Sequence, residues 1–379
     1  MIAVSFDVCI FQVTFWKKWF RMTRYSCVFV VQNHFAGLIL TMNSSRTVAF
    51  SKNATNVFFH ILTACNLRCR HCYINPSQHG AESLNIGTIT AWLNTFAGKE
   101  NSPNVIFLGG EPTLHPELPI AVKHARQLGY QSITIDTNGY LFHDILHRMN
   151  PDDVDFISFS LDGATPGVND SLRGDGAYHA CMKGIRLAVL RGFQASLIYT
   201  VSIANLHELE KMPELLSDLG IRRFFIQFVG IRGKSAQTTA SEPDRIKQVS
   251  PDQWLHEAPM VAQKAAMMGI SVTYPRVFLK PGEPFECAGR VADNYFIFPN
   301  GRVYQCPLCE DYPLHSRIFE NNRLISTPGI NETDLFKLDI TEGCVMNRII
   351  QPGNIRYLPD GSPEYRIACC LLKEDICGG

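Results

Sequence analysis

The residues best suited to chemistry in this chain are three cysteines, Cys65, Cys69 and Cys72, which lie within eight consecutive positions. They follow residues 56–62, an apolar run rich in β-branched and aromatic side chains that predicts a β-strand. Soft thiolate sulfur selects zinc, copper(I) or the iron of an iron–sulfur cluster, and a cubane cluster takes four such ligands. Three cysteines with no fourth beside them therefore indicate a cluster with one iron left open.

The spacing Cys-x3-Cys-x2-Cys after a first strand resembles the cluster loop of the radical S-adenosylmethionine (radical SAM) enzymes. This resemblance implies that Cys65, Cys69 and Cys72 hold a 4Fe–4S cluster whose open iron chelates S-adenosylmethionine (AdoMet). It also implies that the reduced cluster breaks the sulfonium bond and yields a 5′-deoxyadenosyl radical, which abstracts hydrogen from an unactivated C–H bond. The family usually has an aromatic residue before the third cysteine, whereas this chain has His71 there and Tyr73 after it. That departure concerns only the packing around the adenine.

The elements that must position these residues are predicted from short β-like runs that alternate with helical patterns after residue 56, which is typical of β-α units and a parallel sheet. The predicted strands are 57–62, 105–108, 132–136, 156–161, 195–201 and 223–228. The predicted helices between them are 86–96, 116–128, 141–149, 178–190 and 206–219. Six units fit a partial (β/α)6 barrel of the TIM type, whose strand carboxyl ends share one face.

The segment Gly109, Gly110, Glu111 and Pro112 directly follows the second predicted strand. It resembles the "GGEP" motif by which radical SAM enzymes bind the amino group of AdoMet. The resemblance implies that the glycines allow backbone carbonyls to approach the ligand closely, and that Glu111 supplies negative charge for the ammonium group. The longer run Gly-Gly-Glu-Pro-Thr-Leu-His-Pro-Glu-Leu distinguishes this segment from an ordinary glycine turn.

Polar residues at the ends of the later strands resemble AdoMet-binding positions of the family. Asn138 ends the third strand, Ser160 and Asp162 end the fourth, and Gln227 ends the sixth, where backbone groups are expected to meet the adenine. Arg173 is a candidate partner for the methionine carboxylate or for the substrate. The structural alternatives are an Asn-Gly turn, an Asp162 turn cap and a surface ion pair of Arg173.

A second group of cysteines begins at Cys287 and continues with Cys306, Cys309 and Cys344. Residues 295–304 form two β-like runs around a Pro-Asn-Gly turn and predict a hairpin. The spacing Cys-x13-Gly-x4-Cys resembles the start of the SPASM and twitch domains, which hold auxiliary iron–sulfur clusters in radical SAM enzymes. The resemblance implies one auxiliary cluster on these four cysteines, because the dense run of a full SPASM domain is missing. Three C-terminal cysteines either supply a ligand or have no role: Cys369, Cys370 and Cys377.

Structural zinc is the alternative for both groups of cysteines. The first group forms a three-cysteine site with His60 or His71 in that interpretation, and the second forms a four-cysteine site. A protein of this kind has a degenerate barrel that binds a partner and does not cleave AdoMet. It is colourless and contains zinc but no iron.

Composition limits the class of protein. The chain has 379 residues, 46% of them hydrophobic, and a formal net charge of +0, so it buries a large core and has no basic excess for nucleic acid. Thirteen cysteines grouped in a long chain indicate metal binding in a reducing compartment, the cytoplasm.

Before residue 42, charged and polar residues interrupt the apolar runs before a membrane span of about 18 residues is reached. We interpret residues 1–41 as a mis-assigned extension, with a membrane-associating leader as the alternative.

The expected organisation is a radical SAM core at 42–233, a linker and helix at 234–286, and a small cysteine-rich α+β domain with an auxiliary cluster at 287–379. The resemblance implies an enzyme that matures a peptide or a protein, with flavodoxin or ferredoxin as the electron donor. The second hypothesis is a small-molecule step in tetrapyrrole or molybdopterin-type cofactor synthesis. No acid–base residue is assigned from the sequence.

Overall fold

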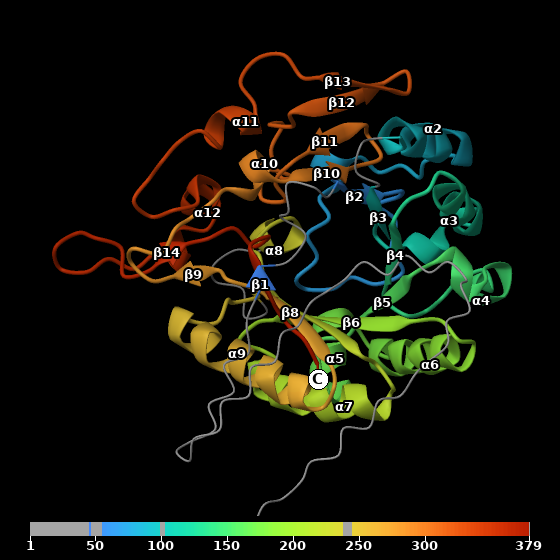
Figure 1. Cartoon of the computed structure of the whole chain (residues 1–379), viewed down its shortest axis with the longest axis horizontal. Helices are drawn as coiled ribbons and strands as arrows, with labels where there is room; N and C mark the ends of the chain where they lie inside the picture. Colours follow the sequence, from blue (N-terminus) through green and yellow to red (C-terminus); the bar gives the residue numbers. More distant parts are fainter. Residues whose placement is uncertain (1–44, 47–54, 99–102, 238–244, 379) are drawn as a thin grey trace, which may run out of the picture. The chain divides into compact units, whose positions relative to one another are not determined.

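One large sheet organises the described part of the chain (Figure 1). The computed structural model describes residues 45–46, 55–98, 103–237 and 245–378, and the chain from Ser44 onward forms one compact unit. The predicted extension at 1–41 lies outside the described residues. The thirteen strands of the sheet have the order β1-β15-β8-β7-β6-β5-β4-β3-β2-β10-β11-β12-β13.

The centre of the sheet is parallel. Its strands are β2 (Thr55–His60), β3 (Asn104–Leu108), β4 (Ser132–Thr137), β5 (Phe156–Ser160), β6 (Ala195–Val201), β7 (Arg223–Phe228) and β8 (Ser271–Pro275). Each strand pairs in parallel with the next along the chain, and such pairs need a crossover connection. All six predicted strands are confirmed. The seventh, β8, was not predicted.

The two faces of the parallel strands have different surroundings. Phe58, Ile106, Thr134 and Phe156 align in one row across β2 to β5, and each is only partly buried. Side chains alternate between the faces of a strand, so neighbouring residues such as Phe59 point to the other face, where Phe59 is fully buried. The helices therefore cover one face, and the other face lines the interior of the barrel.

Helices connect the parallel strands (Figure 1). Their bounds are α1 (Pro76–His79), α2 (Ile86–Phe96), η2 (Pro112–Leu114), α3 (Leu118–Gln127), α4 (Ile145–Arg148), η3 (Pro151–Asp153), α5 (Pro166–Arg173), α6 (Ala177–Leu190), η4 (Leu206–Lys211), α7 (Met212–Asp218), α8 (Lys234–Gln237) and α9 (Pro251–Met267). The helix predicted at 141–149 is shorter than expected, because Leu141, His143 and Asp144 have positive φ angles. Helix α9 continues through Pro259, and a capping box of Ser250 and Gln253 begins it.

The C-terminal region adds strands to the sheet beyond both edges of its parallel part. Strand β10 (Asp293–Ile297) pairs in parallel with β2 and begins an antiparallel series with β11 (Arg302–Tyr304), β12 (Arg317–Glu320) and β13 (Arg323–Ser326). The predicted hairpin is confirmed, and Gly301 occupies its turn with φ +84°. At the other end, β15 (Lys373–Ile376) pairs with β8 and with β1 (Ser45–Arg46).

The remaining elements of the C-terminal region are short. They are β9 (Phe278–Leu279), α10 (Ala288–Val291), α11 (Glu332–Leu335), α12 (Val345–Ile350), η5 (Pro352–Asn354) and β14 (Arg366–Ile367). Strands β9 and β14 pair with each other. Because the sheet of the core continues into this region, the domain boundaries at 233 and 287 stay predictions.

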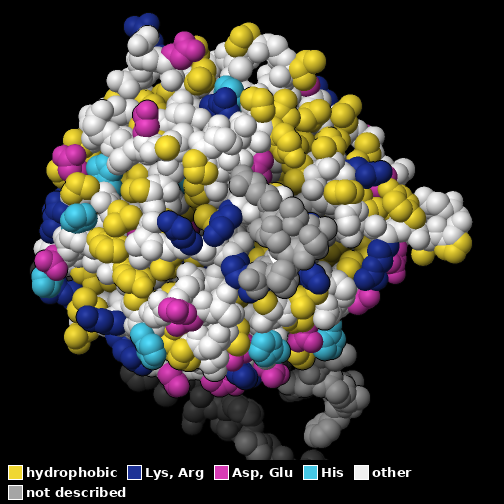
Figure 2. All heavy atoms as spheres, turned by 180° about the vertical axis from the view of Figure 1, so that it is seen from behind, with side chains coloured by type: hydrophobic (Ala, Val, Ile, Leu, Met, Phe, Trp, Pro, Cys, Tyr) yellow, Lys and Arg dark blue, Asp and Glu magenta, His cyan; other side chains and the backbone are white. Residues whose placement is uncertain are grey.

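The barrel and the cysteine-rich region have separate apolar cores. The larger core joins the strands and helices of the barrel, and the smaller core contains Cys306, Cys309, Cys344 and Cys369 among aromatic and aliphatic side chains. Within the described residues, no helix combines the length and the apolar character that a bilayer crossing needs. Figure 2 shows basic, acidic and hydrophobic side chains interspersed over one face of the molecule.

Candidate functional site

The loop with Cys65, Cys69 and Cys72 begins just after β2, at the carboxyl end of the strand. All three thiols are free, Cys65 is exposed, and the other two are partly buried. Backbone hydrogen bonds anchor the loop from both sides: Arg70 N–H donates to Leu172 at 2.9 Å, and Lys234 N–H donates to the Cys72 carbonyl at 3.0 Å. The loop is therefore held in place by residues far away in the sequence.

The three thiols are near one another, since the charges of Cys69 and Cys72 both act on the Cys65 thiol. Burial raises the pKa of the Cys69 thiol. Across residues 45–46, 55–98, 103–237 and 245–378, no group of three or more His, Cys, Asp or Glu side chains converges as a single metal ion requires. A cubane cluster binds its thiolates at separate iron atoms, so its ligands stand farther apart than those of one ion.

Gly109 and Gly110 lie directly against the start of the cysteine loop. A Cβ atom on Gly110 would stand 2.2 Å from the Ala64 carbonyl oxygen, and one on Gly109 would stand 2.5 Å from that of Leu62. Gly110 N–H donates to the Leu62 carbonyl, and Glu111 N–H to that of Ala64, both at 3.0 Å. The glycines are therefore required because any side chain would displace the cysteine loop.

Glu111 connects the ends of β3 and β4. Its buried carboxylate accepts the hydroxyl of Thr137 at 2.8 Å, the hydroxyl of Thr113 at 2.5 Å and the backbone N–H of Asn138 at 2.7 Å. Burial raises the pKa of Glu111, and these donors oppose that shift. Since its oxygens already have protein donors, Glu111 positions Asn138. Its predicted contact with the AdoMet ammonium stays a prediction.

Asn138 reaches the cysteine loop. Its side-chain amide donates to Asn66 at 2.8 Å and lies 3.9 Å from the Cys65 sulfur. The Tyr140 backbone N–H donates to the Asn138 side-chain oxygen at 3.2 Å, so the expected Asn-Gly turn is also present. The Asn138 side chain therefore stabilises the turn through its oxygen and contacts the cysteine loop through its amide nitrogen.

Asp162 is fully buried and holds two basic side chains. Its Oδ2 lies 2.6 Å from Arg173 Nε and 3.1 Å from His71 Nε2, while its Oδ1 accepts the Thr200 N–H at 2.7 Å. Burial alone would raise the pKa of Asp162, but Arg173 and His71 hold it well below its usual range. The Cys69 thiol lies 3.9 Å from the Arg173 carbonyl oxygen. The surface ion pair considered for Arg173 is wrong, because this pair is buried.

Ser160 and Gln227 occupy positions on strands that line the barrel interior. Ser160 pairs with Ile198 of β6, and Gln227 pairs with Thr200 of the same strand, and both Ser160 and Gln227 are partly buried. Pro112 begins η2 and is buried. The structure thus brings Asn138, Asp162 and Arg173 to the cysteine loop, whereas Ser160 and Gln227 lie on strands of the barrel wall.

A further set of side chains was missed in the sequence. The Tyr73 hydroxyl lies 2.8 Å from His60 Nε2, and the Arg232 guanidinium lies 4.6 Å from the centre of the Tyr73 ring. Arg232 also donates to the Pro307 carbonyl at 2.6 Å and pairs with Glu310. These residues connect the cysteine loop with the C-terminal cysteines. The aromatic residue next to the third cysteine was the only signal for them.

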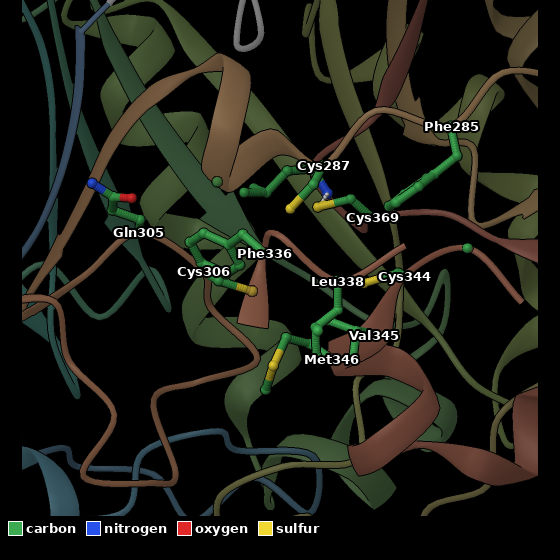
Figure 3. Close-up of a pocket in the computed structure, with 13 residues that line it drawn as sticks. Phe285, Cys287, Gln305, Cys306, Phe336, Leu338, Cys344, Val345, Met346 and Cys369 are labelled. Carbon is green, nitrogen blue, oxygen red and sulfur yellow. Dashed lines mark hydrogen bonds between the residues drawn. The ribbon is translucent and has the colours of Figure 1, made fainter. Parts of the chain in front are cut away.

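Four cysteines line one pocket in the C-terminal region (Figure 3). Cys287 precedes α10, Cys306 follows β11, Cys344 precedes α12, and Cys369 follows β14. Three members of the predicted set, Cys287, Cys306 and Cys344, are among them. Cys309 is completely buried and is not one of the lining residues. From the sequence, Cys369 was one of three C-terminal cysteines that either supply a ligand or have no role.

Known proteins support the interpretation of the first cysteine loop. Residues 60–216 match the model of the Radical SAM superfamily. The chain is 28% identical over 197 residues to "Fe-coproporphyrin III synthase" of Methanosarcina barkeri, covering 51% of this chain and 49% of the relative. It is 29% identical over 164 residues to "Probable GTP 3',8-cyclase" of Saccharolobus solfataricus, covering 43% and 53%. The chain thus spans about half the length of these curated relatives.

Solved structures share the fold. The native anSMEcpe structure with bound AdoMet and Kp18Cys peptide has a TM-score of 0.57 at 12% identity, covering 84% of this chain and 93% of that one. Streptococcus suis SuiB has a TM-score of 0.53 at 14% identity, covering 79% and 68%. The predicted partial barrel is therefore confirmed. Residues 60–216 of this chain therefore carry a radical SAM domain.

Proposed function

We propose that this chain is a radical SAM enzyme in which Cys65, Cys69 and Cys72 hold a 4Fe–4S cluster. Such a cluster, when bound and reduced, supplies the electron that cleaves AdoMet to methionine and a 5′-deoxyadenosyl radical. The observation that carries the proposal is the placement of three free thiols at the carboxyl end of the first parallel strand. The donor set fits, because a site with three thiolates leaves one iron for AdoMet.

The residues around the loop have positioning roles in this proposal. Gly109 and Gly110 let the loop lie against the end of β3, and Glu111 fixes Asn138 beside Cys65. Asp162 pairs with Arg173 at 2.6 Å, so the guanidinium near Cys69 has a counter-ion. Ser160, Gln227 and the backbone around Pro112 then provide the remaining contacts to AdoMet.

A peptide or a protein is the proposed substrate. Two structures with the same fold are described as bound to peptides, SuiB with its precursor peptide SuiA and anSMEcpe with the Kp18Cys peptide. The interior of the barrel offers polar side chains for such a substrate, since Asp136, Ser158 and Ser196 are aligned across three strands. A small carrier such as flavodoxin or ferredoxin is the proposed electron donor, and the cytoplasm is the proposed compartment.

A small-molecule substrate is the second candidate. The observation that favours it is the similarity to "Fe-coproporphyrin III synthase" and to "Probable GTP 3',8-cyclase", whose names refer to a porphyrin and to GTP, both of them small molecules. Consumption of a peptide library or of a tetrapyrrole by the reduced enzyme separates the two hypotheses. In the peptide hypothesis, only the peptides change in mass.

The C-terminal cysteines are proposed to hold an auxiliary iron–sulfur cluster, as in SPASM and twitch domains. Three thiols of the predicted set line one apolar pocket, which is the observation in favour of it. Arg232, Glu310 and Tyr73 bridge the pocket region and the first cysteine loop. An auxiliary cluster there would exchange an electron with the substrate radical or bind the substrate directly.

The enzymatic proposal is tested by AdoMet cleavage. The full chain is purified without oxygen, reconstituted with iron and sulfide, and incubated with AdoMet and dithionite, and 5′-deoxyadenosine is quantified by chromatography. The proposal predicts the nucleoside with the unsubstituted chain and its loss in Cys69→Ala. If the purified protein contains zinc but no iron and does not cleave AdoMet, the proposal is wrong and the protein is the zinc-stabilised binding protein described as the alternative in the sequence analysis.

A further inference from the structure

We propose that Cys369, and not Cys309, is the fourth thiolate of the auxiliary cluster. The inference rests on the proposed function, because it concerns the ligands of the cluster proposed there. The sequence favours Cys309, since it follows Cys306 at the short spacing that metal sites often use. The structure places another sulfur at the pocket. Figure 3 shows the side chains of Cys287, Cys306, Cys344 and Cys369 around one space.

The pocket is apolar apart from these thiols and Gln305. Its walls are formed by Phe285, Phe336, Leu338, Val345, Met346 and Leu371. The Phe336 ring lies so close to Gly289 that a Cβ atom there would be 2.4 Å from the ring, so the pocket is closed on that side. Cys306, Cys344 and Cys369 are at least nine-tenths buried and free of disulfides. Free thiols gathered in a dry pocket are the donor set of an iron–sulfur cluster.

Cys309 lies next to Cys306 but is not among the residues that line the pocket. Its backbone N–H donates to the Cys306 carbonyl at 3.0 Å, and its thiol contacts both the Cys306 thiol and the carboxylate of Glu332. Glu332 is itself fixed, because it accepts the N–H groups of Gln305 at 2.7 Å and of Cys306 at 3.1 Å. Cys309 is fully buried and absent from the lining of the pocket, whereas Cys369 is part of that lining.

The Cys369 backbone is held by neighbouring elements. Cys344 N–H donates to the Ile367 carbonyl at 2.8 Å, and Ala368 N–H donates to that of Val277 at 2.6 Å. Strand β15 begins four residues after Cys369 and pairs with β8 at the edge of the barrel. A cluster bound to Cys369 would therefore restrain the segment that leads into β15, and loss of the cluster should increase local opening of the hydrogen bonds between β15 and β8.

The iron content of matched variants tests the ligand set. A chain in which Cys65, Cys69 and Cys72 are all replaced by alanine removes the first cluster, so iron then reports only on the auxiliary site. After anaerobic reconstitution, this background should retain about four iron atoms per chain. Adding Cys369→Ala should lower iron at least twofold. Adding Cys309→Ala or Cys370→Ala should leave it unchanged, and circular dichroism checks the fold of each variant.

Hydrogen exchange provides a readout that does not depend on iron. Cys369→Ser, which retains the size of the side chain, should increase amide exchange in β15, whereas Cys309→Ser should not. Loss of iron in Cys309→Ala with normal iron in Cys369→Ala would overturn the assignment. Zinc in place of iron, or no metal in the background chain, would also overturn it. Neither of these results changes AdoMet cleavage by the unsubstituted chain, so the proposed enzymatic function is judged separately.

Discussion

Replacing Asp162 by asparagine should strongly destabilise the protein. The substitution retains the shape of the side chain and an oxygen for the Thr200 N–H, but it removes the negative charge that lies 2.6 Å from Arg173 and 3.1 Å from His71. Asp162 is fully buried and the Arg173 side chain is 9% exposed, so the guanidinium would be left buried without a counter-ion. Removing one partner of a buried ion pair typically costs about 3–5 kcal/mol.

Urea unfolding of the metal-free chain, followed by circular dichroism, measures this loss without a contribution from the cluster. The double variant Asp162→Asn with Arg173→Met should recover about half of it, since no unpaired charge remains. Asp252→Asn is the matched control, because it breaks the exposed pair with Arg356 and should leave the midpoint almost unchanged. A loss below about 1 kcal/mol in Asp162→Asn would refute the central role of this ion pair.

Two further predictions follow from backbone contact and from a buried acid. Gly110→Ala should lower the iron content of the reconstituted chain by about half, through loss of the first cluster alone, because its Cβ would stand 2.2 Å from the Ala64 oxygen. Gly167→Ala has open space and should retain all of its iron, so equal iron in both variants would contradict the steric argument. Burial raises the pKa of Asp136 to about 7. Between about pH 4 and 7 the Asp136 carboxyl therefore keeps its proton in the folded chain and loses it in the unfolded chain, so the folded state loses stability as the pH rises through that range. Asp136→Asn should therefore be more stable than the unsubstituted chain at pH 8, by on the order of 2 kcal/mol, but not at pH 4, and a difference independent of pH in thermal unfolding would contradict the assignment.

The order of the barrel strands could be predicted from the sequence, because each strand is a short run with a strand pattern between helical segments. The hairpin at 295–304 was predictable for the same reason, since Asn300 and Gly301 mark its turn. The helix at 141–149 was overestimated, because positive φ angles at Leu141 and His143 do not appear in a pattern of apolar residues. Local sequence thus specified the elements better than their exact ends.

The partners of the site residues could not be predicted, because they depend on tertiary structure. Asp162 meets His71 although the two lie on different loops, and Glu111 is surrounded by donors from β4. The choice between Cys309 and Cys369 shows the same limit. Spacing in the sequence favours the near cysteine, whereas folding brings the distant one to the pocket.

The central claim is that AdoMet binds to an iron of the cluster on Cys65, Cys69 and Cys72. The most direct measurement is the electron paramagnetic resonance spectrum of the dithionite-reduced full chain, recorded without and with AdoMet. AdoMet should change the g values of one cluster signal, and this change should be absent in Cys69→Ala. A spectrum that AdoMet leaves unchanged, in a chain that contains its full complement of iron, would contradict the account.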